Sequence, residues 1–179
     1  MTFDPPVAVL RTGGAGGWTL AEPLTYLGRR DRFVVPAGFG TDLATVPRPV
    51  LWLVPESGRH TLAAVLHDWL CTVGIATGVV TSRDADGIFR RAMREAGVPV
   101  LLRWLMWTGV RWGALVDADP RRRRGWLLSA PGVLAISALA APVVLPPSLL
   151  VVPGLAVYAA LERLVSGRDG VRPWTRRSR

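Results

Sequence analysis

The chain has 179 residues, of which 50% are hydrophobic, and a mean hydropathy of +0.29. This average is too apolar for an ordinary soluble domain and too low for a protein embedded throughout a membrane. It therefore predicts one folded domain joined to a membrane-embedded segment. The apolar fraction excludes global disorder. The single cysteine, Cys71, excludes an intramolecular disulfide framework and fits a reducing compartment.

The net charge of +9 arises from 22 basic and 13 acidic residues, and every basic residue is an arginine. Residues 117–179 hold 10 arginines and 4 acidic residues, so the positive excess lies beside the most apolar stretch. The run Arg121–Arg124 has no interleaved aromatic residues and no nucleic-acid-binding motif. No nucleic acid is therefore expected as a partner, and the run is better explained as a membrane-flanking anchor.

The first part of the chain predicts short strands followed by helices. Alternating and β-branched residues between turn signals predict strands over Val7–Leu10, Trp18–Leu20, Leu24–Leu27 and Arg32–Val35. These strands would form a small antiparallel sheet or hairpin. A loop rich in proline and glycine follows over Pro36–Pro49.

Helical spacing of apolar residues then predicts three helices, over Arg59–Val73, Ser82–Ala96 and Pro99–Val116. Thr81 or Ser82 would cap the second helix, and Gly97 would end it. The third helix mixes tryptophan and arginine, which suits either a core helix or a helix at a membrane surface.

A stretch of 37 residues without charge, Gly125–Leu161, predicts a membrane segment. One continuous helix of that length would span roughly 55 Å, whereas the hydrocarbon core of a bilayer is only about 30 Å thick. A helical hairpin fits better, with Trp126–Leu145 and Ser148–Val165 as its arms and Pro146–Pro147 as the reversal. Both arginine clusters would then lie on one side, as the positive-inside rule requires. The alternative is a buried or re-entrant hairpin.

The predicted fold class is therefore α+β: a small antiparallel sheet or hairpin, a helical core and a C-terminal membrane hairpin. The expected divisions are a soluble domain over 1–117, a basic linker over 118–125, the hairpin over 126–165 and a basic tail over 166–179. Because no signal peptide is recognisable at the start, the domain and the tail are expected to face the cytoplasm from a membrane location.

Polar residues that could carry chemistry gather around the adjacent pair His67 and Asp68. If the first two helices pack antiparallel, Asp86 can return to His67, and an imidazole held by a carboxylate is a general-base arrangement. Asp68 would point about 100° away on the helix and could hold a hard cation. Asp42 and nearby loop carbonyls could complete an oxygen shell.

Each of these residues also has a purely structural explanation. Asp42 could be a turn or cap residue, and His67 a hydrogen-bonded core residue. Asp68 could pair with Arg48 or Arg59, and Asp86 with Arg90. His60 and His67 share a helix face and so permit a two-histidine metal site, although no third ligand is evident. Cys71 lies one turn beyond His67, where it is either activated by the histidine or a small buried hydrophobe.

Several established chemistries lack their motifs. The chain has no HExxH zinc motif, no GxxxxGK[ST] phosphate loop and no GxSxG nucleophile elbow.

Four ordered motifs, PLTYL, FVVPAGFGTDLATVPR, AAVLHDWL and SRDADGIFRRAM, resemble a phage and prophage family known as domain of unknown function 1353. The resemblance covers roughly Trp18 to Gly113. It implies an origin in a phage or prophage and brings no settled activity.

AAVLHDWLCTVG followed by DADGIFRRAM is also similar to the two core helices of the phospholipase A2 superfamily. The resemblance implies that His67 activates water, that Asp86 (or Asp84) orients it, and that Asp68 binds calcium. Asp42 and the Leu43 carbonyl would be the loop ligands. The sequence departs from those enzymes in having one cysteine, no signal peptide, and Cys71 where they usually have tyrosine.

The leading hypothesis is a membrane-anchored, phospholipase-like, calcium-dependent ester hydrolase that acts on membrane lipid. The alternative is a non-catalytic, membrane-tethered binding or assembly module.

Overall fold

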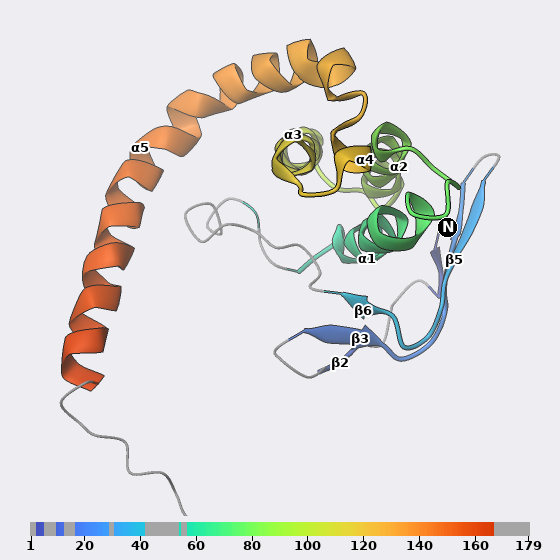
Figure 1. Cartoon of the computed structure of the whole chain (residues 1–179), viewed down its shortest axis with the longest axis horizontal. Helices are drawn as coiled ribbons and strands as arrows, with labels where there is room; N and C mark the ends of the chain where they lie inside the picture. Colours follow the sequence, from blue (N-terminus) through green and yellow to red (C-terminus); the bar gives the residue numbers. More distant parts are fainter. Residues whose placement is uncertain are drawn as a thin grey trace, which may run out of the picture. The chain divides into compact units, whose positions relative to one another are not determined.

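The computed structural model describes residues 3–5, 10–12, 17–28, 31–41, 54 and 57–166. Six short strands precede the helices in the described chain (Figure 1). They are β1 (Phe3–Asp4), β2 (Leu10–Thr12), β3 (Trp18–Leu20), β4 (Leu24–Leu27), β5 (Arg32–Val35) and β6 (Gly40–Thr41). The strands predicted over residues 18–20, 24–27 and 32–35 are confirmed. Of the strand predicted over Val7–Leu10, all but Leu10 lies outside the described residues.

The strands form two antiparallel sheets of three strands each, in the orders β1–β4–β5 and β2–β3–β6. In the first sheet, Tyr26 pairs with Phe33 and Leu24 with Val35. These four side chains are buried, whereas Leu27 and Val34 are exposed. Alternation along a strand sends successive side chains to opposite faces, so this sheet has one face toward the core.

The helical core contains α1 (Thr61–Trp69), the π-helical turn η3 (Leu70–Gly74), α2 (Ser82–Glu95) and α3 (Val100–Val116). The first predicted helix is thus shorter than expected, because the chain changes from α to π geometry after Trp69. A π turn widens the hydrogen-bond spacing, and such turns occur often at functional sites. The second and third predicted helices are confirmed within one residue at each end.

Local capping explains the bounds of α2. The Thr81 hydroxyl accepts from the Asp84 amide, and the Asp84 carboxylate accepts from the Thr81 amide, which is a capping box. At the other end Gly97 has a φ of +75°, a conformation that glycine adopts without a steric penalty. The residues of α2 that face the core are Ser82, Ala85, Asp86, Ile88, Phe89, Ala92 and Met93.

A short helix, α4 (Pro120–Arg123), precedes the long apolar helix α5 (Trp126–Ser166). The reversal expected at Pro146–Pro147 is absent, and α5 continues through both prolines. A proline removes one backbone donor, but its fixed φ is helical, so it does not force a turn. The Ser148 hydroxyl donates to the Val144 carbonyl at 2.7 Å, a bond that is compatible with a continuing helix.

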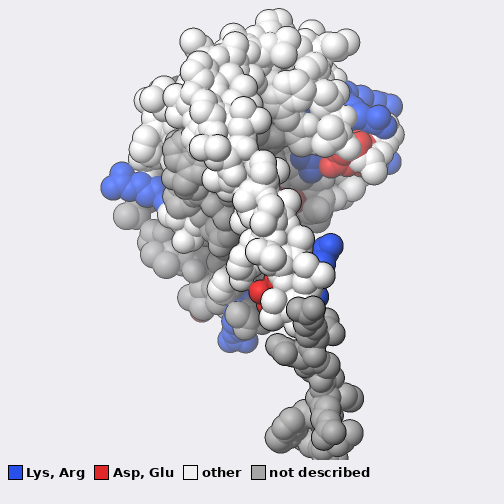
Figure 2. Space-filling view, turned by 90° about the vertical axis from the view of Figure 1, so that its left-hand side faces the viewer, with Lys and Arg blue, Asp and Glu red and all other residues white. Residues whose placement is uncertain are grey.

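The chain divides into two compact units, Met1–Ala141 and Pro142–Arg179, and the boundary falls within α5. The first turns of α5 therefore belong to the same unit as the helical core. Apart from Glu162 and Arg163, α5 carries no charged residue. Figure 2 shows this as a long, almost uncharged surface with charged side chains only toward the end of the helix.

A polar contact joins the first sheet to α2. The Tyr26 hydroxyl donates to Glu95 Oε2 at 2.9 Å and accepts from Arg91 Nε at 3.2 Å. Burial, partly offset by Arg91, raises the pKa of Tyr26 to about 12. The tyrosine ring is fully buried, whereas Glu95 is exposed and Arg91 is partly exposed.

We expect Tyr26→Phe to lower the free energy of unfolding by about 1–2 kcal/mol, because the hydroxyl bonds two charged groups that water can only partly resolvate. Thermal and chemical unfolding of the full chain in detergent micelles would measure this. Tyr158→Phe is the matched control, since Tyr158 is 65% exposed on α5. Equal stability of the two variants would contradict the assigned role of the Tyr26 contact.

Candidate functional site

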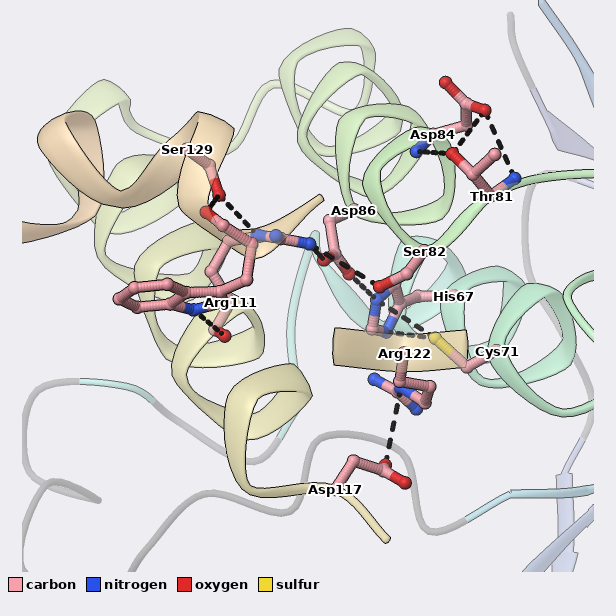
Figure 3. Close-up of polar contacts among 11 residues, drawn as sticks. His67, Cys71, Thr81, Ser82, Asp84, Asp86, Arg111, Asp117, Arg122 and Ser129 are labelled. Atoms are coloured by element: carbon pink, nitrogen blue, oxygen red, sulfur yellow. Dashed lines mark hydrogen bonds and ion pairs between the residues drawn. The ribbon is translucent and has the colours of Figure 1, made fainter. Parts of the chain in front are cut away.

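The candidate site lies among α1, η3, α2 and α3, where polar side chains meet inside the helical core (Figure 3). His67 is on the buried face of α1, and Asp86 is on the buried face of α2. His67 Nε2 lies 2.7 Å from Asp86 Oδ1. The packing of α2 against α1 therefore brings Asp86 to His67.

Asp86 is held by a second charged residue. Its other oxygen, Oδ2, accepts from Arg111 Nη1 at 2.8 Å. Arg111 comes from α3 and is fully buried, and Asp86 is 1% exposed. Because burial of an unpaired carboxylate is very costly, the arginine provides the charge that Asp86 needs inside the core.

Cys71 is the third member of the group around His67. Its Sγ lies 3.4 Å from His67 Nε2 and 3.9 Å from His67 Nδ1. The two residues are one turn apart along the α1–η3 segment, which places their side chains on one face. The ring of His67 also packs against Phe89, with 4.7 Å between ring centroids. One side of the imidazole is thus polar and the other is aromatic.

The charge state of His67 is set by opposing effects. Burial disfavours the imidazolium, but the electrostatic influence of Cys71 and the hydrogen bond to Asp86 outweigh burial and raise the pKa of His67 to about 10. The hydrogen bond to Asp86 favours the ring form that carries a proton on Nε2. Nδ1 is then the nitrogen that gains or loses the second proton.

The other expected residues have different places. Asp84 forms the capping box with Thr81, and Asp86 is the carboxylate that contacts the histidine. Asp68 accepts a hydrogen bond from the Thr41 hydroxyl on β6. Asp42 and Leu43 lie outside the described residues.

Arg90 and Arg59, the arginines suggested as partners of Asp86 and Asp68, have the following contacts. The guanidinium of Arg90 lies over the ring of Trp104, 4.1 Å from its centroid, and the arginine that pairs with Asp86 is Arg111. Arg59 donates to the Gly97 carbonyl at 3.3 Å.

One group of described residues offers three metal-ligand atoms close together: those of His67, Cys71 and Asp86, all within 4.8 Å of one another. Nitrogen, sulfur and one oxygen are donors suited to zinc rather than to calcium, which prefers oxygen ligands. Asp68 offers the oxygen donor type that calcium requires, but it is not part of this group.

Arg111 is the site residue that the sequence reasoning missed. It is a charged residue within the otherwise apolar helix Val100–Val116, where Arg103 is the only other charged residue. A lone charge among apolar residues of a helix can indicate a buried partner. The mixture of tryptophan and arginine suited either a core helix or a helix at a membrane surface, and it did not single out Arg111.

We expect Asp86→Asn to lower the pKa of His67, because the neutral amide no longer stabilises the imidazolium. An NMR titration of the imidazole nitrogens would show the second protonation of His67 moving down from about 10 toward 6.5. Asp84→Asn on the same helix is the matched control, and its titration should follow the wild type. An unchanged titration in Asp86→Asn would show that Asp86 does not control the proton on His67.

The stability of the fold should therefore depend on pH. Because the pKa of His67 is higher in the folded chain than in the unfolded one, the contribution of this residue to the free energy of unfolding is complete below pH 6.5. It is lost as the pH rises through about 10, and chemical unfolding at a series of pH values would measure the loss.

Comparison with known proteins adds one finding. No characterised protein and no solved structure shows significant similarity to the chain. The family described as "Protein of unknown function (DUF1353)" matches residues 18–110, which include β3 to β6, α1, η3, α2 and the first eleven residues of α3. His67, Asp68, Cys71 and Asp86 all lie within the match, whereas Arg111 lies one residue beyond it. Because the match covers more than half of the 179 residues, the chain belongs to the DUF1353 family.

Proposed function

We propose that the protein is a membrane-associated hydrolase of lipid esters in which His67 is the general base. The observation that carries this proposal is the 2.7 Å contact of His67 Nε2 with Asp86 Oδ1 in the helical core. A carboxylate that orients one ring nitrogen prepares the other for proton transfer. Arg111 supports this arrangement because it fixes the second oxygen of Asp86.

The proposed reaction is attack of water on an ester carbonyl. His67 Nδ1 takes a proton from water as the water oxygen forms its bond to the carbonyl carbon. The tetrahedral intermediate then collapses, the bond to the alcohol oxygen breaks, and His67 returns the proton to that oxygen. Asp86 stays ionised and stabilises the imidazolium that forms between the two steps.

Calcium is part of the proposal as the group that would polarise the carbonyl oxygen. Asp68 would bind it together with Asp42 and the Leu43 carbonyl. Support comes from Thr41, the residue before Asp42 in the sequence, because its hydroxyl donates to the Asp68 carboxylate. Asp68 is partly exposed, so a cation could reach it.

Helix α5 would bring the protein to its substrate. The helix has 41 residues, and a window of 18 residues within Trp126–Val165 reaches a mean hydropathy of 2.1. By length and composition the helix could cross a membrane. The stretch from Pro142 to Val165 would extend about 36 Å as a helix, enough for a hydrocarbon core about 30 Å thick. The cytoplasmic side for the first unit and an origin in a phage or prophage remain part of the proposal.

A non-catalytic, membrane-tethered module is the second candidate. It is favoured by the burial of the pair, because the His67 side chain is only 8% exposed and Asp86 is already balanced by Arg111. A structural ion network would have the same contacts. This candidate requires no hydrolysis.

We expect the full chain in mixed detergent–phospholipid micelles to release fatty acid when calcium is present, and to stop when a chelator is added. His67→Gln should lower the rate roughly 10²- to 10⁴-fold, because general-base catalysis contributes about that much. Asp84→Asn should retain the wild-type rate. Folded protein that releases no fatty acid, or a rate unaffected by His67→Gln, would favour the structural module instead.

The rate should also rise with pH from 7 toward 10. Because the raised pKa keeps His67 protonated at neutral pH, the base form increases about tenfold for each pH unit below about 10. A rate that does not vary with pH over this range would exclude His67 as the base.

We expect the two ends of α5 to lie on opposite sides of a bilayer, because one continuous helix crosses only once. The variants Asp119→Cys and Arg163→Cys, each reconstituted into sealed vesicles, would test this by reaction with a membrane-impermeant maleimide. One position should react at once and the other only after detergent is added. The buried native Cys71 should stay unlabelled in both. Equal reactivity at both positions would contradict a single crossing.

A further inference from the structure

Arg111 is the largest fully buried side chain of the described chain. Its guanidinium contacts two helices besides its own. Nη1 lies 2.8 Å from Asp86 Oδ2 and 3.5 Å from Ser82 Oγ, both on α2, and Nε donates to Ser129 Oγ on α5 at 2.9 Å. Nη2 has no hydrogen-bond partner among the described residues. The orientation of the guanidinium therefore depends on α2 on one side and on α5 on the other.

The first turn of α5 holds Arg111 at two points. The Ser129 hydroxyl donates to the Trp126 carbonyl at 2.8 Å, which turns its lone pairs toward Arg111 Nε. Trp126 Nε1 donates to the backbone carbonyl of Arg111 at 2.8 Å. Because Trp126 and Ser129 are three residues apart, they lie on one face of the helix. This face fixes both the main chain and the side chain of Arg111 (Figure 3).

The contacts continue from Arg111 into the candidate site. Asp86 uses Oδ2 for Arg111 and Oδ1 for His67 Nε2, so the plane of the carboxylate is fixed by partners at both oxygens. A change in the position of Arg111 must rotate this carboxylate or leave one oxygen without its partner. Either change alters the hydrogen bond to His67, because charge-assisted bonds depend strongly on distance and angle.

We propose that Arg111 is a positioning residue through which the first turn of α5 sets the geometry of the Asp86–His67 pair. The pair would be well ordered when α5 packs against α3, and loosened when the first turn of α5 moves away. Arg111 itself would touch neither water nor ester. The catalytic meaning of this control rests on the proposed function, whereas the control of the pair does not.

Two serines of α5 allow a matched test. Ser129 accepts from Arg111, and Ser137 accepts from Trp112 Nε1 at 3.1 Å. Both hydroxyls therefore join α5 to α3, but only that of Ser129 leads to Asp86. Ser129→Ala and Ser137→Ala each remove one such bond, so a merely structural role predicts similar effects at His67.

The measurement is the rate at which the His67 Nε2 proton exchanges with solvent, followed by NMR in the full chain in detergent micelles. We expect Ser129→Ala to speed the exchange about tenfold, because Arg111 is held less firmly and Asp86 opens more often. Ser137→Ala should leave the rate near that of the wild type. Ser129→Thr keeps a hydroxyl and should restore slow exchange.

Arg111→Lys is a second variant that tests the same link without changing α5. A lysine retains the charge but cannot bond Ser129 and Asp86 through a fixed planar fork, so exchange should again be faster. It also provides the test if Ser129→Ala does not fold. The proposal would be overturned if exchange in Ser129→Ala and Arg111→Lys stayed as slow as in the wild type. It would also be overturned if exchange were equally fast in Ser129→Ala and Ser137→Ala.

These outcomes are distinct from those of the hydrolysis assay. Faster exchange in Ser129→Ala, with no hydrolysis by the wild type, would retain the positioning role and reject the hydrolase. Hydrolysis that depends on His67, with both hydrolysis and proton exchange unchanged in Ser129→Ala, would retain the hydrolase and reject the positioning role.

Discussion

The Asp86 carboxylate is the group around which the helical core is organised, because each of its oxygens bonds a different helix. One oxygen meets His67 of α1, and the other meets Arg111 of α3. All three side chains are buried. A buried ion set of this kind costs desolvation energy that its Coulomb attraction often only balances, and apolar residues of similar size can be equally stable. Stability alone is therefore a poor explanation for the three residues, and a role in orienting His67 explains them better.

Charge balance also limits what this site can do. Two potential cations face one carboxylate, so protonated His67 and Arg111 together exceed the charge of Asp86. Burial opposes the extra proton, whereas Cys71 and Asp86 favour it strongly enough to raise the pKa of His67. A base must lose that proton before it can act. In the proposed reaction, control of Asp86 would therefore be control of the base, because a weaker hydrogen bond from His67 to Asp86 would lower the pKa of His67.

Local patterns in the sequence predicted most of the fold. The strands β3, β4 and β5 follow from alternation between turn residues, and α2 follows from Thr81, its apolar periodicity and Gly97. The possibility that Asp86 returns to His67 followed from pairing the first two helices antiparallel, and the two side chains do meet at 2.7 Å. The pairing of short strands into two sheets depends on distant contacts and could not be predicted in this way.

The sequence was less informative where tertiary contacts decide the outcome. The sequence did not identify the role of Arg111, because its partners lie 25 positions earlier and 18 positions later in the chain. The proline pair at 146 and 147 suggested a reversal, but prolines keep a helical φ, and α5 continues through both of them. The change to π geometry after Trp69 likewise has no local signal.

The two parts of α5 differ in what surrounds them, and it is the start of the helix that contacts Arg111. Near its start, Trp126 and Ser129 use polar groups to bond Arg111, and Val133 is fully buried. Farther along, the leucines and valines are largely exposed, including Leu149, Leu150 and Leu164. By length and composition, a helix with this apolar surface could cross a membrane. The polar contacts of α5 with α3 come from Trp126, Ser129 and Ser137, so it is the first part of the helix that connects to Asp86 through Arg111.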